Sequence, residues 1–331
     1  MARPLQLRFR AVAEDEPGAR WQALFARAWP DYRRWFLEEG DARRPGYLTC
    51  EQALRHYMPE LAPTWSRLVG LAGGGDHEAR MLSLFCPTPY LVACSQALWT
   101  RGDPVLIRNY DYHPDYCEGV LLRSCWRGTA VIASSDCLWG ALDGMNADGL
   151  AVSLGFGGRR VVGEGFGIPL ILRYLLETCR TVDEAAAVLH RVPPHMAYTV
   201  GLLDAAGAHA TVYVGPDRES EVHHTPIATN HQGRVEWPEY AALTRSVERL
   251  AALEAALRRP DVTPERLLRQ FLRPPIVGDQ WERAFGTLYT AAYYPADGRV
   301  ELHWPHVAMT QSFDRFAESE TVVRYPVRRT S

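Results

Sequence analysis

The sequence predicts an α+β fold in which antiparallel sheets are covered by blocks of helices. Apolar and β-branched runs between residues 81 and 155 are typical of strands, and tight turns join them. Two amphipathic helical segments follow together, and further hairpins come after them at 197–214 and 286–304. Short turns pair strands antiparallel, whereas a doubly wound α/β sheet would alternate single strands with single helices.

The first 80 residues are predicted to be helical. An apolar stripe from Trp21 to Ala28 ends before Pro30. Thr49 and Gln52 have the spacing of a capping box that would open a second helix, and Thr64 could cap a third. The glycine-rich segment 72–77 is expected to be a flexible break before the strands begin.

The strands are predicted from runs of apolar residues, and the turn at 100–103 is typical of a hairpin. The predicted strands are 82–85, 90–99, 104–112, 119–126, 129–134, 137–143 and 149–155. Pro169 would lie in the first turn of the next helix, and Thr181 with Glu184 would cap the one after it. A further amphipathic helix is expected over residues 243–257.

Composition excludes several classes of function. The chain has 331 residues, a net charge of −3 and 36 basic residues, every one an arginine. A chain without lysine has no side-chain amine for a Schiff base, a P-loop or a Ser–Lys dyad. The absence of excess positive charge argues against nucleic acid as a partner.

The cysteines and histidines do not form a metal or disulfide pattern. Seven cysteines occur without a C-x-x-C pair, and the eleven histidines include no H-E-x-x-H motif. We therefore expect no metal and no cofactor. The glycine-rich loop at 163–167 lacks the spacing of a dinucleotide fingerprint. No signal peptide or 18-residue apolar run is visible, so we expect a cytoplasmic protein without membrane association.

One hairpin carries residues that suit nucleophilic catalysis. Cys94 lies on its first strand, and Arg108 and Asp111 lie on its second strand. A four-residue turn would place residue 94 opposite residue 109, with Asp111 within diagonal reach on the face of Cys94. Arg108 would then point to the other face unless a bulge redirects it. A small cysteine packed in a core strand explains the same residue equally well.

Two asparagines extend this set. Asn146 lies in the turn sequence DGMNADG at 143–149, and Asn230 lies in Thr229-Asn230-His231. Asparagine is a common turn residue, which accounts for both positions without function. Its side-chain amide also serves as a hydrogen-bond donor in oxyanion holes.

Taken in order, these motifs resemble those of the cysteine N-terminal nucleophile hydrolases. The run of Cys94-Ser95, R-N-Y-D (108–111), D-G-M-N-x-D-G-L (143–150) and T-N-H (229–231) is most similar to the isopenicillin-N acyltransferase-like proteins. Choloylglycine (bile salt) hydrolases are related to them. The resemblance covers about residues 90–325 and implies a four-layer αββα sandwich, preceded here by a helical N-terminal segment.

The resemblance also implies roles for individual residues. Cys94 would be the nucleophile, and its α-amine, released by autoproteolysis, would be the general base. Asp111 would hold that amine, and Arg108 would lie beside the thiol. Asn146 and Asn230 would complete the oxyanion hole and the amine network, and Arg245 is our best match for a later arginine. Residues 1–93 would then be the pro-segment of a zymogen, and 94–331 the catalytic domain.

The function implied is that of an amidohydrolase or acyltransferase. It would act on a linear non-peptide or N-acyl amide through a thioester acyl-enzyme, with a small-molecule amide or acyl donor as its partner. Two alternatives stay open. An unprocessed thiol hydrolase would use His231 or His113 as its base. A non-catalytic protein on the same scaffold would only bind a ligand.

Overall fold

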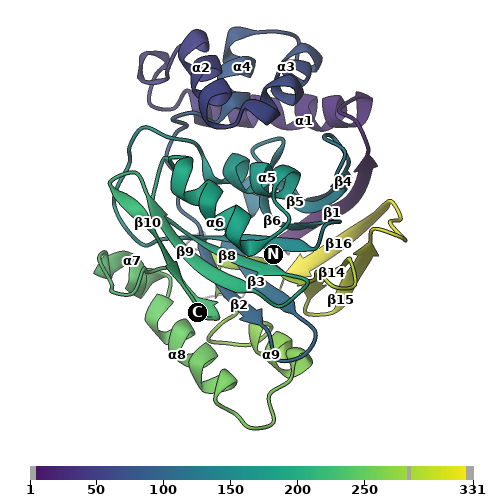
Figure 1. Cartoon of the computed structure of the whole chain (residues 1–331), viewed down its shortest axis with the longest axis vertical. Helices are drawn as coiled ribbons and strands as arrows, with labels where there is room; N and C mark the ends of the chain where they lie inside the picture. The colour runs from purple at the N-terminus through teal and green to yellow at the C-terminus, as the bar shows by residue number, and fades with distance from the viewer. Residues whose placement is uncertain (1–4, 282–284, 326–331) are drawn as a thin grey trace.

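The computed structural model describes residues 5–281 and 285–325 and consists of stacked layers (Figure 1). Two β-sheets pack face to face, and helices cover the outer face of each sheet. This arrangement confirms the predicted α+β class and the four-layer αββα sandwich of mainly antiparallel sheets. The main apolar core lies between the two sheets and beneath the helices.

The larger sheet has nine strands in the order β10-β9-β8-β7-β6-β5-β4-β1-β16. Neighbouring strands are antiparallel except β1 and β4, which are parallel. The strands are β1 (Leu5–Glu14), β4 (Val120–Ser124), β5 (Val131–Asp136), β6 (Gly140–Asn146), β7 (Leu150–Phe156), β8 (Tyr198–Asp204), β9 (His209–Gly215), β10 (Arg218–His223) and β16 (Ser319–Tyr325).

The second sheet has seven strands, six of them in the order β11-β2-β3-β13-β14-β15, with β12 paired to β13. Two of its inner strands, β2 and β3, form the predicted hairpin. The strands are β2 (Ala93–Trp99), β3 (Val105–Tyr112), β11 (Ile227–Ala228), β12 (Asp279–Gln280), β13 (Phe285–Tyr294), β14 (Arg299–Trp304) and β15 (Val307–Ser312).

Helices α5 (Ile168–Thr178) and α6 (Val182–Arg191) cover the nine-stranded sheet. Helices α8 (Ser246–Leu257) and α9 (Pro264–Phe271) cover β2 and β3 on the opposite side, with α7 (Pro238–Leu243) beside them. As predicted, Thr181 caps α6 by accepting a hydrogen bond from the backbone N–H of Glu184.

Side chains on the central hairpin alternate between two apolar cores, as the period of a strand requires. Cys94, Leu98 and Tyr110 point into the main core between the sheets. Ala97 and Trp99 point to the other side, where they pack with residues of α8 and α9. Both faces of β2 are therefore buried, so any chemistry at Cys94 takes place inside the protein.

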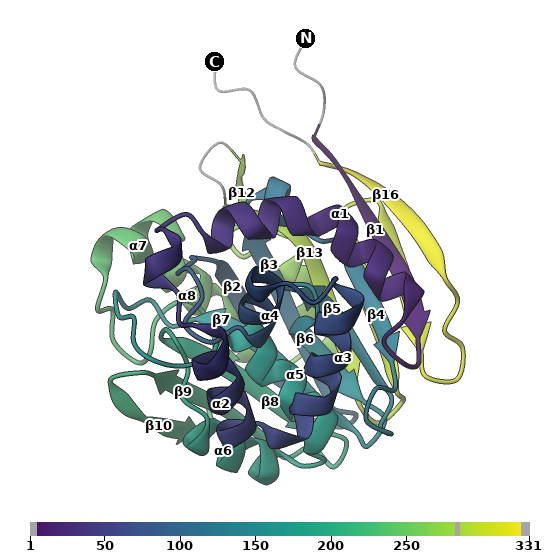
Figure 2. The same cartoon turned by 90° about the horizontal axis from the view of Figure 1, so that it is seen from above.

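The N-terminal segment differs from the prediction of an all-helical region. Its helices are α1 (Ala19–Phe36), α2 (Tyr47–Tyr57), α3 (Ala62–Leu71) and α4 (Asp76–Ser83). Strand β1 precedes them and lies between β4 and β16 of the nine-stranded sheet (Figure 2). Residues 5–14 alternate apolar and polar side chains, a strand period that the helical prediction overlooks.

Four local predictions in this segment are wrong, and one of them is that Thr64 caps a helix, since α3 already begins at Ala62. Helix α1 continues through Pro30 to Phe36, because burial of aromatic side chains along one face outweighs the single hydrogen bond lost at proline. Helix α2 begins two residues before Thr49, so Thr49 is not its cap. Residues 82–85 are not a strand, since α4 extends to Ser83 and packs its apolar residues against other helices.

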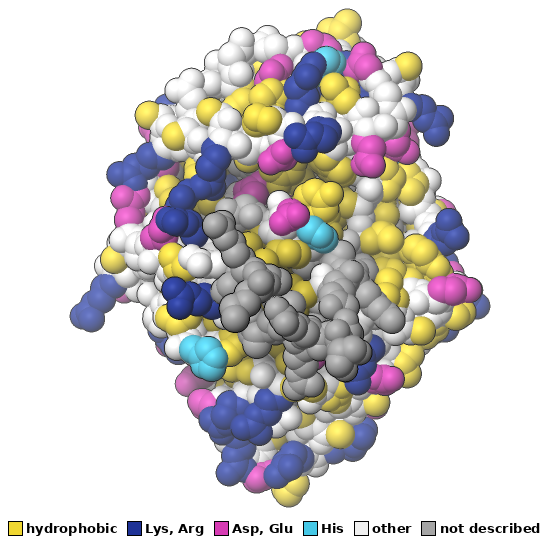
Figure 3. Space-filling model, turned by 180° about the vertical axis from the view of Figure 1, so that it is seen from behind, with side chains coloured by type: hydrophobic (Ala, Val, Ile, Leu, Met, Phe, Trp, Pro, Cys, Tyr) yellow, Lys and Arg dark blue, Asp and Glu magenta, His cyan; other side chains and the backbone are white. Residues whose placement is uncertain are grey.

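The surface of the molecule is uneven in character. Figure 3 shows the face opposite to that of Figure 1, with arginines gathered at the lower end and apolar side chains concentrated nearer the middle. The arginines at the lower end belong to the region of α8 and α9. Within the described part of the chain, no helix combines the length and apolar character needed to cross a membrane.

Strand β1 joins the two sheets through Phe9, which predicts that the N-terminal segment is part of the stable fold. The Phe9 ring is buried, and its centroid lies 4.6 Å from that of Trp304 on β14. We expect Phe9→Ala to lower the free energy of unfolding by about 3 kcal/mol, through lost burial and the cavity left behind. Gln6→Ala, at an exposed position of the same strand, should change it by less than about 0.5 kcal/mol. Equal denaturation midpoints for both variants would contradict this role.

Candidate active site

The hairpin pairs its strands one residue away from the predicted register. Trp99 lies opposite Val105, so five residues connect the strands instead of four. Cys94 consequently lies opposite Tyr110, and Ala93 lies opposite Asp111. The prediction that Asp111 shares the face of Cys94 is therefore wrong. Arg108, two residues from Tyr110, is the side chain on the face of the thiol.

On this face, Arg108 is positioned to stabilise a thiolate. Its Nη2 atom donates a hydrogen bond to Cys94 Sγ at 3.2 Å, and its other terminal nitrogen, Nη1, pairs with buried Asp143. The guanidinium carbon lies 4.7 Å from the centre of the Tyr110 ring. Burial raises the pKa of the Cys94 thiol, while the charge and hydrogen bond of Arg108 oppose that rise.

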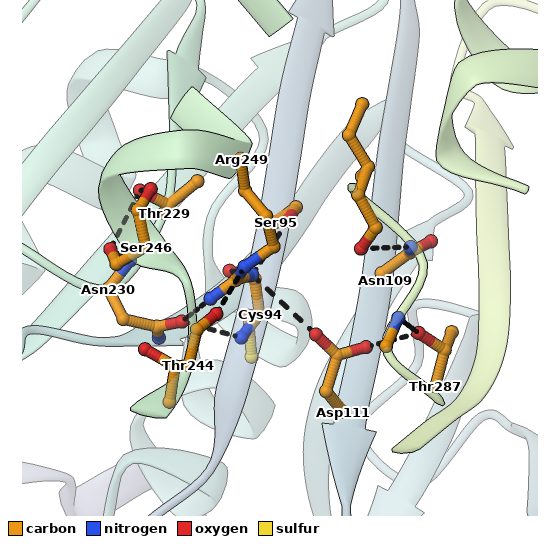
Figure 4. Close-up of polar contacts among 12 residues, drawn as sticks. Cys94, Ser95, Asn109, Asp111, Thr229, Asn230, Thr244, Ser246, Arg249 and Thr287 are labelled. Atoms are coloured by element: carbon orange, nitrogen blue, oxygen red, sulfur yellow. Dashed lines mark hydrogen bonds and ion pairs between the residues drawn. The ribbon is translucent and has the colours of Figure 1, made fainter. Parts of the chain in front are cut away.

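On the other face, the side chain of Arg249 reaches from α8 to the backbone of Cys94 (Figure 4). Its Nη1 atom donates to the Cys94 carbonyl oxygen at 2.6 Å and to Ser95 Oγ at 2.8 Å. The same atom lies 3.5 Å from Asp111 Oδ2, and Nη2 donates to Asn230 Oδ1 at 2.6 Å. One buried cation thus fixes the backbone of Cys94, a carboxylate and an amide.

Asn230 presents its side-chain oxygen to the nitrogen of Cys94. The Cys94 N–H donates to Asn230 Oδ1 at 3.0 Å. The Asn230 Nδ2 atom donates to the Phe156 carbonyl at 3.0 Å, and Ser246 Oγ accepts from the backbone N–H of Asn230 at 2.8 Å. These bonds fix which end of the amide faces Cys94. Asn230 is therefore placed to orient the nitrogen of Cys94, since its donor group is already engaged.

Asp111 joins this polar group through its ion pair with Arg249. Thr287 donates a hydrogen bond to Asp111 Oδ1 at 2.6 Å, across the β3–β13 pairing. Burial raises the pKa of the Asp111 carboxyl, and the positive charge of Arg249 and the Thr287 hydrogen bond oppose the rise. Asp111 and Arg249 therefore compensate each other's charge inside the protein.

The structure does not bring Asn146 into this group. Its Nδ2 atom donates to the carbonyls of Leu176 and Cys179 at the end of α5, at 3.0 and 2.7 Å. Its oxygen accepts from the backbone N–H of Leu150 at 2.9 Å. Asn146 therefore connects the β6–β7 turn to α5, which is a structural position of the kind that asparagine often occupies in turns.

Arg245 is also placed outside the group, and Arg249 takes the place expected for it. Arg245 precedes α8 in a left-handed conformation and pairs with Glu248 at the surface. Helical spacing could have identified Arg249, because it lies four residues before Leu253 on the buried face of α8. An arginine on an apolar helix face requires a buried partner.

Neither histidine proposed as an alternative base is bound to the thiol. His231 Nδ1 lies 2.8 Å from Ser246 Oγ, and burial together with Arg249 lowers the pKa of this histidine. His113 accepts a hydrogen bond from the backbone of Asp115 in a partly exposed turn. Among the residues that the structure describes, the hydrogen-bond partner of the Cys94 thiol is an arginine.

Comparison with known proteins identifies one matching family and several similar structures. The model of the family "Acyl-coenzyme A:6-aminopenicillanic acid acyl-transferase" matches residues 99–308. Penicillin V acylase from Agrobacterium tumefaciens is 14% identical over 67% of this chain and 87% of its own, with a TM-score of 0.47. No curated protein gives a significant match.

Two further solved structures are similar over more of their length. A variant of conjugated bile acid hydrolase from Clostridium perfringens is 11% identical over 72% of this chain and 99% of its own, with a TM-score of 0.48. An N-acylethanolamine-hydrolyzing acid amidase orthologue from Caenorhabditis elegans is 14% identical over 70% of this chain and 99% of its own, also with a TM-score of 0.48.

The two arginines of the α8 region provide a matched pair for testing the geometry. We expect Arg249→Lys to lower turnover by about a hundredfold, because a lysine ammonium lacks the planar fork that reaches Cys94, Asn230 and Asp111 together. The same change at partly exposed Arg245, which pairs with Glu248, should leave turnover within about twofold. Steady-state rates and their pH profiles check this, and the profile of the Arg249 variant should shift. A greater loss in the Arg245 variant would contradict the assignment.

The contact between Arg108 and the thiol predicts a pH effect. Since Arg108 favours the thiolate, Arg108→Gln should raise the pKa of Cys94 and move its alkylation profile to higher pH. Alkylation of the variant by iodoacetamide at neutral pH should be slower, by about tenfold for each unit of pKa rise. Peptide mapping across a pH series measures it. Arg101→Gln, in the turn of the same hairpin, is the control, and an unshifted profile for the Arg108 variant would exclude this role.

Proposed function

Because the chain belongs to the acyl-coenzyme A:6-aminopenicillanic acid acyl-transferase family, we propose that it is a cysteine-nucleophile enzyme that cleaves or transfers acyl groups at amide bonds. The family match confirms the resemblance found in the sequence. The observation that carries the proposal is the position of Cys94, whose thiol faces Arg108 while its backbone nitrogen faces Asn230.

The reaction uses the two functional groups of Cys94 together. Its α-amine, once free, accepts the thiol proton, and the thiolate attacks the substrate's amide carbonyl. The carbon–nitrogen bond breaks, and the leaving amine takes the proton held by the α-amine. A thioester to Cys94 remains. Water then completes hydrolysis, or a second amine completes acyl transfer. An α-amine titrates near about pH 8, which suits this role at neutral pH.

Each surrounding residue has a distinct task in this scheme. Arg108 stabilises the thiolate on one face of the strand. Asn230 accepts a hydrogen bond from the Cys94 nitrogen, and Asp111 balances the charge of Arg249. Arg249 holds the Cys94 carbonyl so that the residue keeps its place after its N-terminal bond is cut.

The scheme requires that the bond between Ala93 and Cys94 be cut. The Cys94 thiol attacks the Ala93 carbonyl and forms a thioester, which releases the α-amine. Water then hydrolyses the thioester to give the Ala93 carboxylate and the free thiol. A cavity of about 20 Å³ lined by Ala93, Asp111 and Arg249 is large enough for one water molecule.

The segment before the cut is integral to the fold, so the name pro-segment describes its processing only. Strand β1 pairs on both sides, and Phe9 packs between the sheets. We therefore propose that both fragments stay together after cleavage. The seven cysteines are free, which suits a reducing compartment such as the cytoplasm.

The proposed activity is tested with a panel of linear N-acyl amides and activated acyl esters. We expect wild-type protein to gain the mass of the acyl group on the peptide that contains Cys94, and to release amine. Cys94→Ala should lower turnover by at least about a thousandfold while the fold is kept. Cys179→Ala, another buried cysteine, is the control and should retain turnover. Turnover that survives Cys94→Ala would refute the proposal.

Maturation makes a separate prediction. The purified wild-type protein should give fragments of 93 and 238 residues, the latter being 331 − 93, that co-elute in gel filtration. Cys94→Ala should remain a single chain, because it has no thiol to start the acyl shift. Intact-mass spectrometry measures both. An active wild-type protein that stays uncut would transfer the role of base to a histidine, with His231 the first to test.

A further inference from the structure

A cavity of about 520 Å³ lies between helix α1 and strands β4 and β5, and no step of the mechanism above uses it. Its volume is that of a typical small-molecule site. One face of α1 forms a wall, with side chains at helical spacing. The aromatic side chains that line the cavity are Trp21, Tyr32, Trp35, Tyr90, Tyr112 and Tyr116.

The charge of the lining is mainly negative. Five carboxylates line the cavity, against three arginines. The carboxylates are Asp31, Glu38, Asp115, Glu118 and Asp136, and the arginines are Arg8, Arg10 and Arg27. Arg8 and Arg10 both pair with Glu320, which offsets part of their charge. An ammonium group among aromatic rings and carboxylates is stabilised by cation–π and ionic contacts together.

Of the five carboxylates, Asp136 is buried and Glu118 is half-buried, whereas the other three are exposed. Glu118 is saturated, since it accepts hydrogen bonds from Tyr32, Ser135 and the backbone N–H of Leu138 at 2.6–2.8 Å. Asp136 has weaker side-chain contacts: the Tyr32 hydroxyl, whose proton is directed to Glu118, lies 3.3 Å away, and the Cys137 thiol donates at 3.5 Å. Burial and the charge of Glu118 raise the pKa of Asp136 to about 7. Asp136 therefore keeps capacity for a strong donor.

A second, separate cavity of about 10 Å³ adjoins the first on the side of Tyr110. This smaller cavity shares Glu118 and Asp136 with the first and adds Tyr110 and Tyr289 to the lining. Tyr110 is the residue directly opposite Cys94, and its ring lies against Arg108. Its hydroxyl is buried and has no hydrogen-bond partner among the residues that the structure describes. A buried hydroxyl without a partner is a group to which a ligand can bind.

We propose that this cavity is a specificity pocket for an ammonium-bearing apolar or aromatic portion of the substrate, with Asp136 as the recognising carboxylate and Glu118 adding its negative charge beside it. The proposal rests on the amide-cleaving function assigned to Cys94, and its link to that residue is Tyr110, which lines the smaller cavity and pairs with Cys94 across the hairpin. The ammonium group can belong to the acyl portion of the substrate or to its amine portion. If the three arginines dominated the charge of the pocket, it would bind a ligand with a carboxylate more tightly than one with an ammonium group.

Binding is measured without catalysis on the Cys94→Ala protein. The probes are 4-phenylbutylamine, 4-phenylbutanol and 4-phenylbutyrate, titrated by calorimetry. We expect the ammonium to bind about tenfold more tightly than the alcohol, and the carboxylate most weakly. Asp136→Asn and Glu118→Gln should each reduce the ammonium preference while the affinity for the alcohol stays. Asp148→Asn, an exposed carboxylate in the turn between β6 and β7, is the matched control.

Trp35→Leu provides a second route if a carboxylate variant fails to fold, because it removes an aromatic wall without touching the acid pair. It should lower the affinity for ammonium more than that for the alcohol. Tightest binding of the carboxylate, or binding of none of the probes, would overturn the proposal.

Turnover by the wild-type protein shows whether the ammonium group belongs to the acyl or to the amine portion of the substrate. It also tests the pocket separately from the proposed function of Cys94. Amides that carry an ω-ammonium group on the acyl portion are compared with amides that carry it on the amine portion, and the preferred source gives the higher kcat/KM. Charge-selective binding without any acylation of Cys94 would support the pocket and refute the function. Acylation of Cys94 without a preference for either set of ammonium-bearing amides over neutral amides would support the function and refute the pocket.

Discussion

The site depends on one buried ionic contact, that between Arg249 and the groups around Cys94. A guanidinium inside a protein is costly unless each of its donors is used. Here the donors reach the Cys94 carbonyl, Ser95 and Asn230, and Asp111 supplies the opposite charge. The same contacts tie α8, β2, β3 and the turn after β11 together. The contacts that stabilise these layers are therefore the same ones that position Cys94.

A strand suits this chemistry because it separates two environments across its width. The thiol of Cys94 points into the space between the sheets, where Arg108 lies. The backbone nitrogen and carbonyl of Cys94 are bound by Asn230 and Arg249 at the α8 side. The environments of the proposed base, the Cys94 nitrogen, and of the proposed nucleophile, the Cys94 thiol, can thus differ although both groups belong to one residue.

Much of the fold can be predicted from the sequence because strand and helix periods are local properties. The hairpin of β2 and β3, the cap of α6 and the layered α+β class follow from runs and turns of a few residues. Strand β1 shows a local strand period, but its place in the sheet is set by partners that are distant in sequence: β4 begins at Val120 and β16 at Ser319. Long-range pairing leaves little trace in a single chain.

Only part of the candidate site can be predicted from the sequence, because its residues come from segments that are distant in the chain. Cys94, Arg108, Asp111 and Asn230 do lie together, but the predicted hairpin register is one residue off because the turn is longer than expected. Asn146 fits a turn as well as a site, and only its hydrogen bonds to the end of α5 distinguish the two. Choosing Arg249 over Arg245 requires knowing which face of α8 is buried.

The most direct test of the central claim is chemical detection of a terminal cysteine in the active protein. A cyanobenzothiazole reagent condenses only with an amine and a thiol on adjacent carbons, so it labels a cysteine only where its α-amine is free. The account predicts that Cys94 is labelled stoichiometrically and that turnover falls in proportion. Fully active protein in which Cys94 takes no label would contradict it.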